Sequence, residues 1–380
     1  MTGSIDAAEA AAPSRLDRLL PLLDSDPSNL ALLADAAETA LAEQRPEVAA
    51  GLLDRYAAIA PLPPTETNLA GLAALQTRNY GRAADLFGEL VESGVDDPGV
   101  RFNLAWACAM DKKFDRALEL LDDDLARALP QAAMLQVQLL HDRGEFEDAA
   151  TRAREYVELH PTYVPLMAAV SVLALDVEDE ALAAACAAKG GEHPDALTTL
   201  GTLALGDERA TEALDLFDRA LERNSHVPRA WVGRGLARLM TGQSPDAAAD
   251  IDRGAEMFGD HLGSWIAAGW AHFVNKDLAS ARARFETALE LDDTFAETHG
   301  SLAVLDLLEG NAEGAREKSE IALRLDRQCY SAALARSLLA AGAGDEKTAR
   351  RIYEAAINTP VDGSGRTIGQ ALAKLGMGMG

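Results

Sequence analysis

The sequence predicts an all-α protein built as an extended stack of about ten helix-turn-helix units. Small residues and aromatic residues recur in phase at a spacing of about 34 residues along the chain. The 380 residues exceed the usual size of one compact domain, whereas a repeated array grows simply by adding units. Apolar residues make up 48% of the chain, which is enough to fill a large interior.

The clearest unit begins near Leu200. Leu200 and Gly201 are followed at fixed offsets by Ala213, Phe217 and Ala220. The same pattern returns, in some copies weakly, at Trp265, Gly269, Ala281, Phe285 and Ala288; at Phe146, Ala149, Tyr156 and Pro161; at Tyr80, Ala83 and Phe87; at Leu104, Ala105, Phe114 and Ala117; at Trp231, Gly235 and Ala247; at Leu302, Ala303, Gly310, Ala315 and Ala322; and around Ala49, Ala169 and Ala349. Each unit reads as two short amphipathic helices that bury their apolar faces only by stacking on neighbours.

Small and large residues have separate roles in this packing. We expect Gly201, Gly235 and Gly269 to let the paired helix approach closely, and Phe217 and Phe285 to fill the space between helices. Turns such as Arg143-Gly144 and Thr241-Gly242 separate the two helices of a unit.

These offsets resemble the tetratricopeptide repeat, whose pattern is W-x2-L-G-x2-Y, then A-x3-F-x2-A and a final proline. The resemblance covers residues 26–360 and implies a right-handed α-solenoid whose general role is to bind other proteins. Outside it, we expect a disordered N-terminus over residues 1–13 and a capping helix over 14–25, with Ser14 and Asp17 forming a capping box. Residues 361–380 read as a Gly/Ser linker and a short apolar segment that either caps the last repeat or folds back into the groove.

The charge balance limits the partners that the chain can attract. Against 35 Lys and Arg residues stand 61 Asp and Glu residues, and the formal net charge is −26. Nucleic acid and anionic membranes should therefore be repelled. The first residues lack the basic start and apolar core of a secretory signal, and no run is long and apolar enough to insert into a membrane. We expect a cytoplasmic protein, and the abundance of Ala, Leu, Arg and Asp suggests a bacterial one.

Residues suited to catalysis do not converge in the pattern. Cys108, Cys186 and Cys329 are far apart in Ala/Leu-rich helical stretches, and the seven histidines form no paired spacing suited to zinc. The run of residues 363–369 has the glycines of a phosphate loop but neither the preceding strand nor the GK[ST] ending. The three consecutive aspartates at 122–124 are expected on a helix, where they face different directions. We expect no enzyme activity, no cofactor and no metal.

The resemblance implies that positions 2, 5, 6, 9, 12 and 13 of each first helix line a concave groove. The groove candidates are Phe102, Asn103, Trp106, Met110, Met134, Leu166, Met167, Val170, Arg229, Val232, Leu236, Met240, Ile266, Trp270 and Phe273. This surface is apolar and rich in Met and aromatic residues, which favours an apolar or amphipathic segment of a client protein. The alternative is that these side chains simply pack between neighbouring first helices, or that the tail covers them. The Lys, Arg and Asn clamp with which some family members hold a C-terminal carboxylate is missing, because Thr65, Leu69, Gly99, Gln131 and Leu135 stand at its positions beside Asn103.

Three arginines crowd one first helix. Arg234 and Arg238 replace the usual apolar residues, and Arg229 stands near the start of the same helix. Like charges four residues apart destabilise a helix by about 0.2 to 0.5 kcal/mol. Either neighbouring acids such as Asp252 or Glu256 compensate them, or they contact an acidic group on a partner.

The leading hypothesis from the sequence is an interaction scaffold or chaperone-like adaptor that holds a peptide or helix of a client protein in an apolar groove. One alternative is a structural module that self-associates into a homo-oligomer. Another is an accessory subunit that binds a small apolar ligand.

Overall fold

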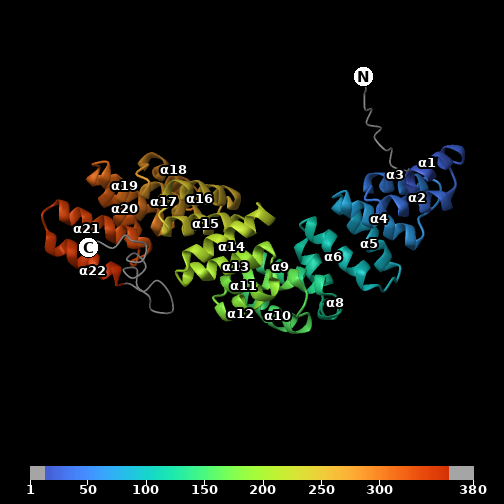
Figure 1. Ribbon diagram of the computed structural model, residues 1–380, viewed down its shortest axis with the longest axis horizontal. Coiled ribbons are helices and arrows are strands. Elements are labelled where there is room, and N and C mark those ends of the chain that lie inside the picture. The colour runs from blue at the N-terminus through green and yellow to red at the C-terminus, as the bar shows by residue number, and fades with distance from the viewer. Residues whose placement is uncertain (1–12, 359–380) are drawn as a thin grey trace, which may run out of the picture. The chain divides into compact units, whose positions relative to one another are not determined.

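The computed structural model describes residues 13–358 and confirms the all-α prediction. This part of the chain contains 22 α-helices and no β-strand, and Figure 1 shows their order. Twenty of the helices form ten successive pairs, in agreement with the expected number of repeats; α1 precedes the first pair, and α8 is the second piece of the interrupted second helix of the third pair. The first helices of the pairs are α2, α4, α6, α9, α11, α13, α15, α17, α19 and α21.

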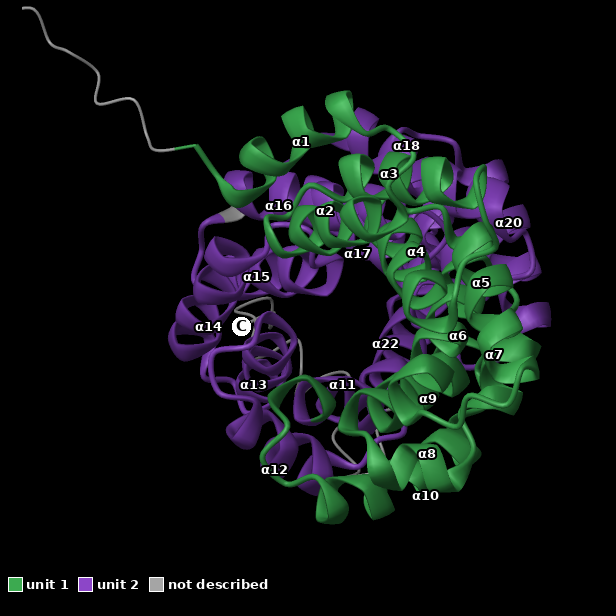
Figure 2. Cartoon of the chain, turned by 90° about the vertical axis from the view of Figure 1, so that its right-hand side faces the viewer, with its two compact units in different colours: residues 1–166 green, residues 167–380 purple. Residues whose placement is uncertain are grey.

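The chain divides into two compact units, residues 1–166 and 167–380, which Figure 2 colours separately. Unit 1 holds α1 (Arg15–Ser25), α2 (Leu30–Ala42), α3 (Pro46–Ala57), α4 (Pro64–Gln76), α5 (Tyr80–Glu92), α6 (Pro98–Met110), α7 (Phe114–Leu120), α8 (Asp123–Ala128), α9 (Pro130–Asp142) and α10 (Phe146–Leu159). The boundary falls within α11 (Val164–Asp176). Unit 2 continues with α12 (Glu180–Gly190), α13 (Pro194–Gly206), α14 (Ala210–Arg223), α15 (Pro228–Met240), α16 (Ser244–Phe258), α17 (Leu262–Val274), α18 (Leu278–Leu291), α19 (Ala296–Leu308), α20 (Ala312–Leu325), α21 (Tyr330–Gly342) and α22 (Glu346–Ile357).

Local signals explain where the helices begin. The capping box predicted for α1 is present, because the Ser14 side chain accepts the Asp17 N–H at 3.1 Å and the Asp17 carboxylate accepts the Ser14 N–H at 3.3 Å. Proline occupies the first turn of α4, α6 and α9, where its missing N–H costs nothing. The starts of these four helices are therefore specified by residues within one turn of them.

The turn inside each pair contains one residue in the left-handed region. Gly144 and Gly242 adopt φ of 74° and 80°, as suits glycine. In other pairs the same position holds a side chain, with φ of 59° at Arg78, 64° at Glu208 and 63° at Lys276. The repeat thus imposes the turn geometry even where the residue disfavours it.

The close approach expected within a pair is confirmed. A Cβ atom added to Gly201 would lie 2.8 Å from the Phe217 ring, and one added to Gly269 would lie 2.3 Å from Phe285. Phe217 and Phe285 are themselves fully buried. Glycine on the first helix therefore makes the space that the aromatic ring of the second helix fills.

The third pair departs from the regular pattern. Its second helix is interrupted between α7 and α8, so Asp122 stands before α8 as its cap rather than on a helix. The interruption leaves the carbonyl of the fully buried Leu121 without a helical partner, and the Gln136 amide of α9 donates to it at 2.6 Å. Gln136 in turn accepts a hydrogen bond from the Tyr156 hydroxyl. A buried polar chain thus satisfies the groups that the interruption exposes.

Candidate functional site

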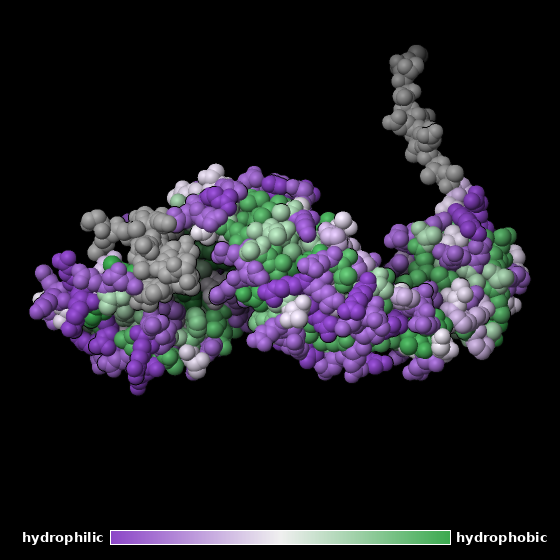
Figure 3. All heavy atoms as spheres, turned by 90° about the horizontal axis from the view of Figure 1, so that it is seen from below, coloured by the Kyte–Doolittle hydropathy of each residue, from purple (hydrophilic) through white to green (hydrophobic). Residues whose placement is uncertain are grey.

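The first helices of unit 2 carry a row of exposed apolar side chains. Leu236, Val274, Leu308 and Leu338 expose 37%, 38%, 53% and 43% of their surface, and Met240 is half-buried. We call these five residues the apolar row. Their positions repeat, since Met240, Val274 and Leu308 follow one another at intervals of 34 residues. On the face that Figure 3 shows, hydrophobic residues form patches bordered by hydrophilic ones.

A packed layer lies directly beneath part of the apolar row. Trp270 and Phe273 of α17 and Leu307 of α19 pack on a buried cluster of Ala303, Val304 and Ala335. Leu334 of α21 packs on the same cluster, which therefore joins three successive first helices. Phe273, Leu307 and Leu334 precede row residues by one or four positions, so well-packed side chains border the row.

The four tryptophans divide into two kinds. The indole N–H groups of Trp231 and Trp265 donate to the carbonyls of Ser225 and Gly259 at 2.9 and 2.8 Å. Trp106 and Trp270, at position 9 of their first helices, donate no hydrogen bond to any residue that the structure describes. Both are half-buried. An amphipathic ring with an unused donor at a surface is typical of a recognition site.

Unit 1 brings together part of its predicted groove. Phe102 and Trp106 lie on one face of α6 with ring centroids 6.3 Å apart, and Met110 at the end of that helix is 38% exposed. Asn103 and Met134 are half-buried. These five residues form a second, smaller apolar surface that belongs to unit 1 alone.

Several groove candidates are packed rather than open. Leu166, Met167 and Val170 are fully buried, so their side chains belong to the interior and not to a surface open to a partner. Val232 packs on Gly254 of α16, because a Cβ atom there would lie 2.5 Å from the Val232 methyl. Ile266 packs on the buried cluster around Phe285. These side chains are therefore packed, and Val232 and Ile266 contact the second helices α16 and α18 rather than neighbouring first helices alone.

The arginines of α15 are paired internally, although not with the acids that the sequence suggested. Arg234 donates to Asp250 through Nε and Nη2, each at 2.7 Å, and to Asp218 at 2.9 Å. Arg238 donates to Asp250 at 2.6 Å. The expectation of Asp252 or Glu256 was wrong, because Asp250 is the acid of α16 that faces α15.

Arg229 is also paired. Its guanidinium donates to both oxygens of Asp176 on α11, at 2.9 and 3.1 Å. The pKa of the nearby His261 is lowered, first by burial and then by the positive charge of Arg229. The arginine cluster therefore supplies no unpaired cation for an acidic partner.

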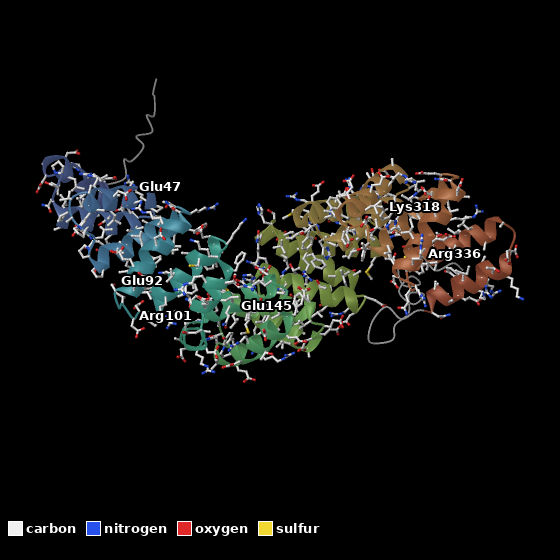
Figure 4. The ribbon with its side chains drawn as sticks, turned by 180° about the vertical axis from the view of Figure 1, so that it is seen from behind. Glu47, Glu92, Arg101, Glu145, Lys318 and Arg336 are labelled. Carbon is white, nitrogen blue, oxygen red and sulfur yellow. The ribbon has the colours of Figure 1, made fainter. Side chains whose placement is uncertain are left out.

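Two other acids of unit 2 hold its helices together. Asp306 on α19 is 3% exposed at its side chain and accepts from Arg282 of α18 and Lys318 of α20 at 2.8 and 2.6 Å, with Lys318 labelled in Figure 4. Burial by itself would raise the pKa of Asp306, but the hydrogen bonds from Lys318 and Arg282 outweigh it and the pKa is lowered. Asp252 behaves likewise, with burial opposed by Arg284 and His272.

Chemically reactive groups are sequestered in the described part of the chain. Burial raises the pKa of all three cysteine thiols, and that of Cys329 reaches about 12. Within residues 13–358, no three His, Cys, Asp or Glu side chains converge as metal ligands would. None of the helices described is both long and apolar enough to cross a membrane.

Val274, Leu308 and Leu338 were missed as groove candidates. Val274 and Leu308 occupy the same position 13 as Met240, and Leu338 occupies the same position 9 as Leu236 and Trp270. Carrying the 34-residue interval through the last repeats would have found all three.

Comparisons with known proteins agree with this architecture. A family model described as tetratricopeptide repeat matches residues 68–133, 198–261 and 241–294. A structure of a monomeric IFIT1 mutant with Gppp-AAAA is 11% identical, covers 90% of this chain and 94% of its own, and has a TM-score of 0.51. PilF of Pseudomonas aeruginosa is 17% identical over 55% of this chain and 96% of its own, with a TM-score of 0.44. Cut9 in its complex with Hcn1 is 14% identical over 90% and 82%, with a TM-score of 0.40. At these identities the likeness concerns the fold alone, and no curated protein matches the chain.

Proposed function

The chain is a tetratricopeptide-repeat protein, and from that premise we propose that it is an interaction scaffold or chaperone-like adaptor that binds a peptide or helix of a client protein. Such repeats generally mediate protein–protein interaction, and their proteins are typically scaffolds without enzyme activity. We place the binding surface on the apolar row of unit 2 and the chain in the cytoplasm. The apolar surface around Trp106 in unit 1 is a second contact of the same kind.

The observation that carries the proposal is the exposure of the apolar row. At a given position of the repeat, side chains normally pack or are polar. Single apolar residues scattered over a protein surface need no explanation. Here Leu236, Val274, Leu308 and Leu338 lie exposed on the four successive first helices α15, α17, α19 and α21, and a buried cluster joins the last three of these helices. Rows of this kind suit an amphipathic segment whose apolar residues repeat along it.

A small-molecule role has less support. Clefts of about 340 and 400 Å³ lie in unit 1 and one of about 260 Å³ lies in unit 2, and charged side chains help to line each of them: Asp54 and Arg82, Glu89 and Arg116, and Arg316 and Arg336. Pockets for apolar ligands are lined mainly by hydrophobic and aromatic residues. Self-association remains a separate alternative, which sedimentation of the purified chain without a client tests directly.

The test compares two double variants that change equal side chains on different faces. Leu308→Asp with Leu338→Asp places charges on the apolar row. Leu291→Asp with Leu325→Asp places them at the ends of α18 and α20, at positions that are 44% and 45% exposed. All four sites are exposed enough that folding should survive, which circular dichroism checks.

We expect affinity capture from the native host to recover a client with the wild type and with the α18/α20 variant, and to lose it with the row variant. Equal recovery by both variants would place the contact elsewhere. Recovery of nothing, together with concentration-dependent mass, would favour the self-associating module instead.

A further inference from the structure

We propose that residues 368–375 of this same chain bind the apolar row and compete with the client. This inference rests on the proposed function. The segment follows the last described helix, α22, and residues 359–380 lie outside the described part of the chain. Three features favour this segment as the ligand of the apolar row: the spacing of its apolar residues, its charge and the length of the linker that precedes it.

The spacing of the apolar residues suits the row. Ile368, Leu372 and Leu375 stand at i, i+4 and i+7, which places them on one face if the segment is helical. The residues between them include Gln370, Ala371, Ala373 and Lys374, which favour a helix. Such a face is the kind of ligand that we infer for the row.

The charge of the segment is opposite to that of the rest of the chain. Residues 363–380 contain Arg366 and Lys374 and no acidic residue, so they carry +2. The whole chain carries −26, and the remaining residues therefore carry −28. Glu309 directly follows Leu308 of the row, is 40% exposed at its side chain and pairs with Arg282 of α18 at 2.7 Å. The net negative charge of the remaining chain thus attracts a basic apolar segment.

The linker is long enough to reach the row. Nine residues, 359–367, separate the end of the described chain from Ile368, and nine residues span at most about 30 Å. α22 packs on α21, which carries Leu338, and α21 packs on α19, which carries Leu308. Packed helices lie about 8 to 10 Å apart and rise about 1.5 Å per residue, so Leu338 is within that reach and Leu308, at the end of α19, is near its limit.

Tethering makes even a weak contact effective. A short flexible linker gives an effective concentration in the millimolar range. If the free segment binds with a dissociation constant of about 100 μM, its tethered copy reduces the affinity of a competitor about tenfold. The client would therefore have to displace the tail, and the tail would raise the client concentration that is needed for binding.

The experiment uses the full chain and a labelled synthetic peptide of residues 361–380 as the probe, with binding followed by fluorescence anisotropy. We expect Leu372→Asp with Leu375→Asp to bind the probe about tenfold more tightly than the wild type, because the chain's own tail no longer competes. Adding Leu308→Asp and Leu338→Asp should abolish this binding, whereas adding Leu291→Asp and Leu325→Asp should leave it unchanged.

Equal affinity of the wild type and the tail variant for the probe, or binding that survives the changes in the row, would overturn the inference. Client capture separates this inference from the function on which it rests. If the wild type and the tail variant capture the same amount of client while the row variant captures none, the adaptor function stands and the tail has no part in it. Increased capture by the tail variant supports both.

Discussion

Unit 1 and unit 2 use the same repeat but hold it together differently. In unit 1 the ion pairs between helices, such as Arg82 with Asp54 and Arg143 with Asp115, have acids that are 53% and 88% exposed at their side chains. In unit 2 the side chains of Asp250 and Asp306 are only 7% and 3% exposed, and each binds two cations. Exposed pairs contribute little to stability, whereas a buried acid depends on its partners.

This difference indicates which buried polar groups the stability of each unit depends on. Unit 1 has one buried polar chain, Gln136 with Leu121 and Tyr156, placed where a helix is interrupted. Unit 2 has uninterrupted second helices and buried acids that link them to the first helices carrying the apolar row. The proposed binding surface of unit 2 therefore depends on charges that acid or mutation can remove.

The largest expected difference between the units is in their stability at low pH. The pKa values of Asp252 and Asp306 are lowered in the folded chain, so their contribution to stability is complete above their unfolded value of about 3.9 and is lost as the pH falls through the folded values. In unit 1 the pKa of Asp122 is also lowered, but its side chain is 48% exposed and its effect is screened. Hydrogen exchange, corrected for intrinsic rates, should show α16–α20 losing protection at a higher pH than α2–α5. Simultaneous loss in both units would contradict this comparison.

A single substitution should reproduce the effect at neutral pH. Asp306→Ala leaves Arg282 and Lys318 without their shared acid, and because Arg282 keeps Glu309 we expect it to destabilise unit 2 by about 2 kcal/mol. The matched change in unit 1, Asp54→Ala, removes an exposed pair and should cost less than about 1 kcal/mol. Hydrogen exchange in each unit measures both, and similar costs would mean that burial of the acid is unimportant.

The polar chain of unit 1 is the next test. Gln136→Leu leaves the buried Leu121 carbonyl and the Tyr156 hydroxyl without their partner, which should destabilise unit 1 by about 2 kcal/mol. Gln138→Leu on the same helix is the control, since Gln138 is half-buried. Thermal unfolding and exchange in α9 and α10 check the result. An unchanged stability would show that water can replace the Gln136 side chain.

The smallest expected effect should be the same in both units. Glu208→Gly relieves a left-handed residue in a turn of unit 2, and Arg78→Gly does so in unit 1. Each should stabilise its unit by about 0.5 to 1 kcal/mol, because the relief of strain exceeds the entropy cost of glycine. A rise in melting temperature for one variant alone would show that the turns of the two units differ after all.

Much of the fold could be predicted because the residues that define each repeat lie close to one another in the sequence. Gly201 and Phe217 belong to one pair, and Gly269 and Phe285 to the pair two repeats later, so the 34-residue interval identified their contact before the structure did. The candidate site was less predictable. Leu338 and Val304 both occupy position 9 of their first helices and both are apolar, yet one is 43% exposed and the other is only 2% exposed. Repeat position alone does not distinguish them, since burial also depends on the neighbouring repeats.

By itself, then, the sequence determined the all-α repeat, the pairing of helices and the turns, because each of these depends on residues within about one repeat of one another. The tertiary structure alone decided which acid neutralises Arg234 and Arg238. Asp250 and Asp252 are two residues apart on α16, so their side chains differ in direction by about 200°, and only the packing of that helix against α15 selects Asp250. It also decided that the second helix of the third pair is interrupted at Leu121, where Gln136 from the next pair satisfies the freed carbonyl. Both outcomes depend on contacts between helices, which a pattern within one helix does not contain.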